Sequence, residues 1–118
     1  SFGLEEKEIE SMIRASHSEA EHDRDLRRLK ENEVEALRII EATDSALAQD
    51  AELLDADELK AIQEGLISLQ ESLKSADADL IQQQSEALNE LSVTFAARRM
   101  DSQIKSAFKG KKLEEVDR

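Results

Sequence analysis

Apolar side chains recur every three or four residues along most of this chain, which is the spacing of one face of an α-helix. Between residues 4 and 49 they form two sets that differ in phase, separated by a charged stretch from His17 to Arg28. The pattern predicts one long N-terminal helix, with a phase break or kink near residues 20–25. Its apolar positions are Leu4, Ile9, Met12, Ile13 and Ala20, then Leu26, Leu29, Val34, Leu37, Ile40 and Leu47.

A second helix is predicted to begin after a short link at residues 50–55. Asp55 stands three residues before Glu58, the spacing of a capping box, in which each side chain accepts a hydrogen bond from the other residue's backbone. The apolar steps that follow alternate between three and four residues, which is typical of a seam packed on neighbouring helices. The seam consists of Leu59, Ile62, Leu66, Leu69 and Leu73, and Gly65 interrupts it.

A third apolar segment begins after Asp77, which we expect to cap it. It changes phase near Ala96, which predicts either two helices or a bundle partner that ends there. Gly110 is a natural residue to follow a helix end, with Lys105 and Lys109 in the last turn. The apolar positions are Leu80, Ile81, Leu88, Leu91 and Phe95, then Ala97, Met100, Ile104 and Phe108.

These elements predict an all-α fold. Residues 1–25 should form a protruding helix, residues 26–110 an antiparallel bundle of three helices or more, and residues 111–118 a frayed tail. Twelve residues form the predicted bundle core: Leu37, Ile40, Leu59, Ile62, Leu66, Leu69, Leu73, Leu88, Leu91, Phe95, Met100 and Ile104.

Composition narrows the function classes. The 118 residues include no cysteine, which excludes disulfides and thiolate metal sites, and only three glycines, too few for the usual phosphate-binding loops. A net charge of −12 argues against nucleic-acid binding, although residues 96–118 reverse the sign, with seven basic and four acidic residues. No segment has the length and hydrophobicity of a membrane span.

Candidate chemistry is sparse. His17 and His22 lie on different faces of a helix, and Glu19 with His22 supplies only one of the two Glu-x-x-His steps of a di-iron bundle. Arg98 and Arg99 could bind an anion, although a solvated helix end explains them better. We therefore predict no catalytic residue, no metal site and no cofactor in this segment. A helical interaction module, such as a free-standing adaptor or coiled coil, fits better than a bundle metalloprotein.

Several motifs resemble the C-terminal helical lid of the seventy-kilodalton heat-shock chaperones of the DnaK class. They are Ser1-Phe2-Gly3-Leu4, Glu8-Ile9 and Met12-Ile13 near the start, a position at which the family's β-sandwich has just ended. The run from Phe95 to Asp101, with Ile104 and Gly110 beyond, is similar to the HscA branch, as is Val34-Glu35-Ala36. The absence of an initiator methionine agrees with an excised piece of a longer protein.

The resemblance implies a lid that gates client release from a β-sandwich outside this chain, under the control of an ATP-binding domain that is also outside it. It further implies a cytoplasmic parent, with an iron–sulfur scaffold protein as client and a J-domain co-chaperone. The implied contacts with the sandwich are Leu4, Ile9, Met12, Ile13 and Asp23. Glu41 and Leu37 occupy positions where the family carries latch residues, so the usual latch salt bridges are not expected. Without the sandwich, we expect self-association through residues 1–25.

Overall fold

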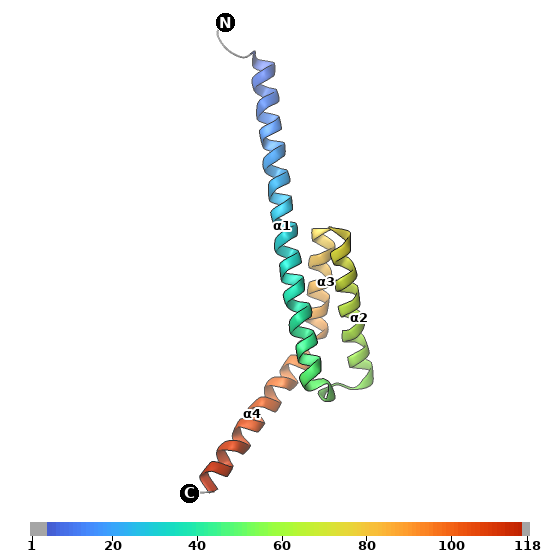
Figure 1. Ribbon diagram of the computed structural model, residues 1–118, viewed down its shortest axis with the longest axis vertical. Helices are drawn as coiled ribbons and strands as arrows, with labels where there is room; N and C mark the ends of the chain where they lie inside the picture. Colours follow the sequence, from blue (N-terminus) through green and yellow to red (C-terminus); the bar gives the residue numbers. More distant parts are fainter. Residues whose placement is uncertain (1–4, 117–118) are drawn as a thin grey trace.

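The computed structural model describes the backbone of residues 5–116 and the side chains of residues 5–111. It contains four α-helices and two short 3-10 helices in a molecule of 93 × 37 × 16 Å, with no strand among the described residues (Figure 1). The elements are α1 (Glu6–Asp50), η1 (Ala51–Leu53), α2 (Ala56–Ser72), η2 (Leu73–Ser75), α3 (Ala78–Leu91) and α4 (Val93–Val116).

Helix α1 is a single element of 45 residues, and it continues without interruption through residues 20–25. Sharp kinks in helices arise mostly at proline, glycine or inserted polar groups, and this stretch has neither proline nor glycine. The change of apolar phase near residue 20 is therefore not a break in the helix.

The starts of α2 and α3 are set by aspartate caps, as predicted. The Asp55 carboxylate accepts from the Glu58 backbone N–H at 2.8 Å, and the Glu58 carboxylate accepts from the Asp55 N–H at 3.0 Å. Asp77 accepts from the Leu80 N–H at 3.2 Å in the same way. These bonds satisfy backbone donors that a helix start otherwise leaves unpaired.

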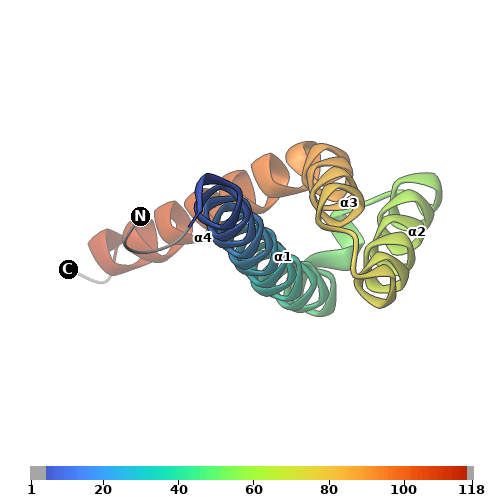
Figure 2. The ribbon, with the colours of Figure 1, turned by 90° about the horizontal axis from the view of Figure 1, so that it is seen from above.

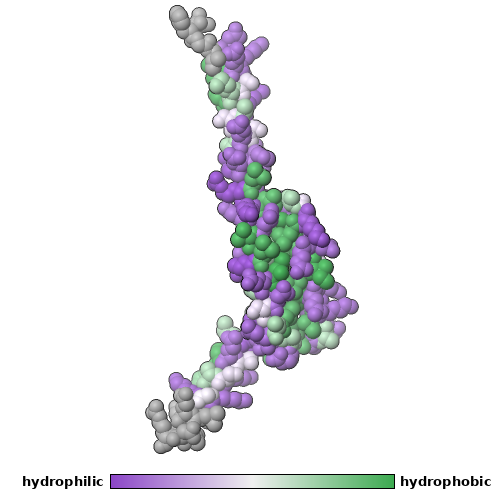
Figure 3. Space-filling model, in the orientation of Figure 1, coloured by the Kyte–Doolittle hydropathy of each residue, from purple (hydrophilic) through white to green (hydrophobic). Residues whose placement is uncertain are grey.

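The C-terminal half of α1 packs with α2 and α3 in a three-helix bundle, while α1 and α4 extend beyond it at opposite ends (Figures 1 and 2). In Figure 3 the apolar surface gathers on the bundle, and the part of α1 that extends above it is largely polar. The buried apolar side chains are Ala36, Ile39, Ile40, Ala46, Ile62, Leu66, Leu69, Ile81, Leu88 and Phe95.

Gly65 allows α2 and α3 to approach closely. A Cβ atom at this position would lie 3.1 Å from Cδ1 of both Leu88 and Leu91, closer than ordinary van der Waals contact. A glycine inside a helix costs about 1 kcal/mol relative to alanine. At this position the lack of a side chain permits the close packing of α2 on α3.

The predicted core was wrong at four of its twelve positions. Leu37, Leu91, Met100 and Ile104 are 46 to 63% exposed. Leu37 faces solvent because α1 contacts the bundle through its Ala36 and Ile39 side, and Met100 and Ile104 lie on α4, which leaves the bundle. Leu91 is the last residue of α3, and it stays 46% exposed although its Cδ1 approaches Gly65 of α2. Leu59 and Leu73 are half-buried, and the buried members of the predicted set are Ile40, Ile62, Leu66, Leu69, Leu88 and Phe95.

The C-terminal region also differs from the prediction. The break between α3 and α4 falls at Ser92, four residues before the expected position. Helix α4 then leaves the bundle (Figure 1) and continues past Gly110 to Val116, so Gly110 does not end it. Of the tail predicted to fray, residues 111–116 are helical, and residues 117–118 lie outside the described part of the chain.

Candidate interaction surface

The first half of α1 is an arm without internal support. Every described residue from 5 to 28 is exposed, and Leu29 is the first to be half-buried. At a rise of about 1.5 Å per residue, the arm is about 34 Å long. We define the arm as residues 6–28.

The arm carries the predicted contact residues on its surface. Ile9, Met12 and Ile13 are 45, 58 and 64% exposed, and their spacing places them on one face. Asp23 is exposed farther along the arm, and Leu4 lies outside the described residues. The arm therefore offers an apolar stripe in an acidic setting, because residues 5–25 hold eight carboxylates and three basic side chains.

Polar contacts along the arm are local. Arg14 pairs with Glu10 at 2.8 Å, and Nε2 of His17 lies 3.0 Å from a Glu21 oxygen, each pair one helical turn apart. Exposed pairs of this kind contribute only a few tenths of a kcal/mol, so they support the helix and leave its apolar face open.

The arm is joined to the bundle by two contacts at its base. Arg28 forms an ion pair with Asp79 at the start of α3, and this hydrogen-bonded carboxylate raises the pKa of Arg28. One turn later the Asn32 side-chain amide donates to the Ala78 carbonyl oxygen at 3.0 Å. These contacts mark the point at which α1 leaves the bundle.

Arg98 holds the opposite end of the bundle. Its guanidinium donates to the Leu53 carbonyl oxygen at 2.9 Å and to the Glu58 carboxylate at 2.7 Å. The hydrogen bond from Arg98 lowers the pKa of Glu58, with a further contribution from the Asp55 backbone N–H. Arg98 therefore connects α4, η1 and the capping box of α2.

Arg99 makes a second connection from α4 back to α1. It donates to Asp50 at 2.8 Å and lies 5.9 Å from the centre of the Phe95 ring, within the range of a cation–π contact. Sequence reasoning offered anion binding or a solvated helix end for these arginines. The structure shows instead that they fix the direction in which α4 leaves the bundle.

A second exposed apolar stripe lies on α4. Met100, Ile104 and Phe108 are 63, 48 and 69% exposed and follow one another at four-residue steps. Lys105, Lys109 and Lys111 are exposed on the same helix. The two projecting helices thus combine apolar faces with opposite charge.

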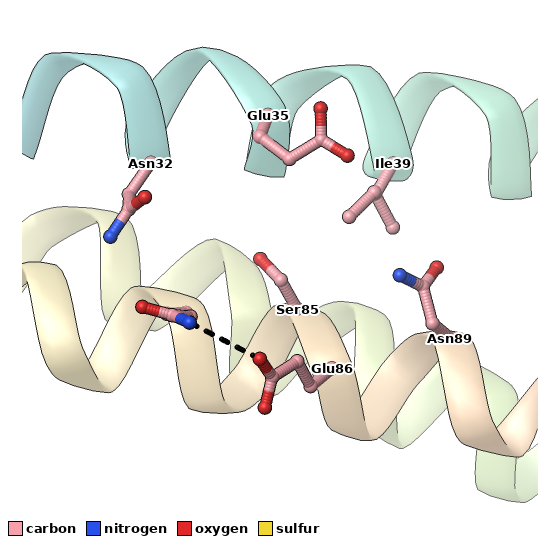
Figure 4. Close-up of a pocket in the computed structure, with 7 residues that line it drawn as sticks. Asn32, Glu35, Ile39, Ser85, Glu86 and Asn89 are labelled. Carbon is pink, nitrogen blue, oxygen red and sulfur yellow. Dashed lines mark hydrogen bonds between the residues drawn. The ribbon is translucent and has the colours of Figure 1, made fainter. Parts of the chain in front are cut away.

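A shallow polar groove of about 290 Å³ lies between α1 and α3 (Figure 4). The buried Ser85 hydroxyl points toward α1 and has no hydrogen-bond partner among the described residues. The lining contains no histidine or lysine that could activate this serine as a nucleophile. The groove is lined by Asn32, Glu35, Ile39, Gln82, Ser85, Glu86 and Asn89.

Other site classes find no support within the described residues. No group of three or more histidine, cysteine, aspartate or glutamate side chains there could hold a metal ion. No helix in this part of the chain is long and apolar enough to cross a membrane.

Sequence reasoning located the arm's apolar stripe but missed the contacts that anchor it. The pairs Arg28–Asp79 and Arg98–Glu58 join residues 51 and 40 positions apart. Glu58 and Asp79 stand in the first turns of α2 and α3, but the sequence does not show which arginine reaches each carboxylate until the topology is known.

Two comparisons with known proteins point to the same family. A family model described as Hsp70 protein matches residues 1–101. Proteins named chaperone protein HscA homolog are similar over 116 residues, or 98% of this chain. The one from Methylococcus capsulatus is 45% identical, that from Cupriavidus metallidurans 45% and that from Shewanella sediminis 44%. The chain spans 19% of the length of each of these relatives.

Proposed function

Because this chain belongs to the Hsp70 protein family, we propose that it is the helical lid of a chaperone's substrate-binding domain. The arm would lie on a β-sandwich that grips the client, with the bundle at its far end. Family membership sets aside an unrelated free-standing adaptor, and it agrees with the all-α fold.

One observation carries this proposal: half of a 45-residue helix is exposed, while its other half is packed in a bundle. A helix in a protein gains most of its stability from packing of its apolar face on a neighbouring surface. The exposed stripe of Ile9, Met12 and Ile13 therefore suits an apolar surface outside this chain. The Arg28 and Asn32 contacts would transmit movement of the bundle to the arm.

The mechanism that we propose is gating. A closed lid covers the peptide groove and slows release, because the client can leave only when the arm separates from the sandwich. ATP binding in a domain outside this chain would open the lid. Within this segment the residues bind and position, and no catalytic step is assigned to them.

We further propose that the parent protein acts in the cytoplasm on a scaffold for iron–sulfur clusters, with a J-domain co-chaperone. The support is the similarity to relatives named HscA homolog, together with the Phe95–Asp101 motif that resembles the HscA branch. These partners would bind through domains outside the chain.

A graft tests the lid role. The matching segment of the Methylococcus capsulatus relative is replaced by this chain, and release of a fluorescent peptide is followed by anisotropy without ATP. We expect release as slow as with the relative's own segment, and faster release when the segment is deleted. A double substitution, Ile9→Asp with Ile13→Asp, should accelerate release about tenfold, since two apolar contacts are lost.

The matched control is Val34→Asp, an equally exposed apolar position on α1 beyond the arm, which should leave the release rate unchanged. If the graft releases peptide as fast as the deletion, the segment is not a lid. If the arm variants release peptide as slowly as the unsubstituted graft, the arm is not what closes the groove.

A further inference from the structure

We propose that the arm of one copy of this chain pairs antiparallel with α4 of a second copy, in a two-fold symmetric dimer. The proposal concerns surfaces within the 118 residues and does not rest on the lid role. It goes beyond self-association through residues 1–25, because it assigns the partner surface to α4.

The two surfaces complement each other in charge. Residues 5–25 hold eight acidic and three basic side chains, whereas residues 98–111 of α4 hold five basic side chains and one acidic one. Two of those five, Arg98 and Arg99, are engaged at the bundle. Lys105, Lys109 and Lys111 form no ion pair with another described residue, so they are available to an acidic helix.

The apolar stripes also match in spacing. Ile9 and Ile13 lie four residues apart, as do Ile104 and Phe108. An antiparallel register that places Ile9 opposite Phe108 places Ile13 opposite Ile104. The same register brings Glu8 opposite Lys109 and Glu6 opposite Lys111, and it sets no like charges directly against each other at these positions.

The shape of the molecule allows both arm–α4 contacts to form in one dimer. The arm and α4 project from opposite ends of the bundle, and α4 is inclined to α1 (Figure 1). A copy turned end over end brings its α4 beside the first copy's arm and its own arm beside the first copy's α4. Both contacts form together, as a two-fold dimer requires.

Pairing of one arm with another arm is disfavoured by the same charges. Two acidic arms would repel each other, and two copies of the lysine-bearing part of α4 would do so as well. If a β-sandwich is present in a longer chain and binds the arm, it competes with this dimer.

Sedimentation equilibrium of the 118-residue chain at low salt tests the proposal. We expect a monomer–dimer equilibrium that weakens with added salt. Glu8→Lys and Lys109→Glu should each raise the dimer Kd about tenfold, because symmetry repeats each reversed pair twice. The double variant should return to within about threefold of the original Kd. Glu71→Lys, an equal charge change on exposed α2 surface, is the matched control.

Ile104→Asp should abolish dimerisation over the concentration range in which the original chain dimerises, with the helical circular-dichroism signal unchanged because this side chain is exposed. A chain that remains monomeric at every concentration would overturn the proposal. A dimer insensitive to Lys109→Glu and Ile104→Asp would also overturn it, and would indicate arm-to-arm pairing. So would a double variant whose dimer Kd is higher than that of either single variant.

Discussion

Replacing Leu88 by alanine should destabilise the bundle strongly. Leu88 has no exposed surface, and it packs against the helix face at Gly65, where there is no side chain to move into a gap. Truncation at a fully buried leucine costs the lost transfer free energy and the cavity left behind, together about 3 kcal/mol. For a domain of this size the midpoint of thermal unfolding should fall by roughly 10–20 °C.

Leu37→Ala is the matched control, since it makes the same chemical change at a position that is 56% exposed. We expect a change of about 0.5 kcal/mol or less in the free energy of unfolding. Urea unfolding followed by far-ultraviolet circular dichroism measures both, and the slope of free energy against urea should stay constant. Losses of equal size in the two variants would refute the packing described here, because both leucines would then be core residues.

Three further predictions concern the backbone and the polar contacts. Gly65→Val should cost about 1–3 kcal/mol by overpacking against Leu88, whereas Gly110→Val, with nothing within 4 Å, should leave bundle unfolding in urea unchanged. Ala76→Gly should stabilise the fold by about 0.5–1 kcal/mol, because Ala76 has a φ of 52°, which costs a residue with a Cβ more than glycine. As the pH is lowered, the free energy of unfolding of the Glu58→Gln variant should fall less steeply than that of the original chain, because Arg98 lowers the pKa of Glu58 in the folded state.

The sign of the acid effect follows from proton binding. With its folded-state pKa lowered, Glu58 binds more protons in the unfolded state at mildly acid pH, so its contribution is complete above the unfolded pKa and disappears as pH falls through the folded one. An identical acid profile for Glu58→Gln would contradict the Arg98 contact. A destabilised Ala76→Gly variant, or an unaffected Gly65→Val variant, would contradict the corresponding backbone geometry.

Local sequence signals predicted most of the helices. The aspartates before α2 and α3 set their starts because capping depends on residues only three positions apart. The long helix and the exposed stripe at Ile9 and Ile13 followed from apolar spacing. The end of α3 was less well placed, since Ser92 interrupts the pattern without a glycine or proline to signal it.

Packing was harder to predict because an apolar stripe does not reveal whether a neighbour lies against it. The buried residues of α1 are Ala36, Ile39, Ile40, Thr43 and Ala46. The predicted core included only Ile40 of these, and it included Leu37 on the adjoining face, which is exposed. Met100 and Ile104 have the spacing of a core face, but α4 leaves the bundle before any partner reaches them.

The central claim is that the arm is free in this chain and docks on a β-sandwich in a longer one. Amide hydrogen exchange over residues 6–28 tests this most directly, because an unpacked helix opens often and a docked one does not. In the grafted chaperone with bound peptide and no ATP, we predict exchange at least tenfold slower than in the isolated chain at a concentration where it is monomeric, with fast exchange restored by ATP. Equal exchange in the graft and the isolated chain would contradict the lid role.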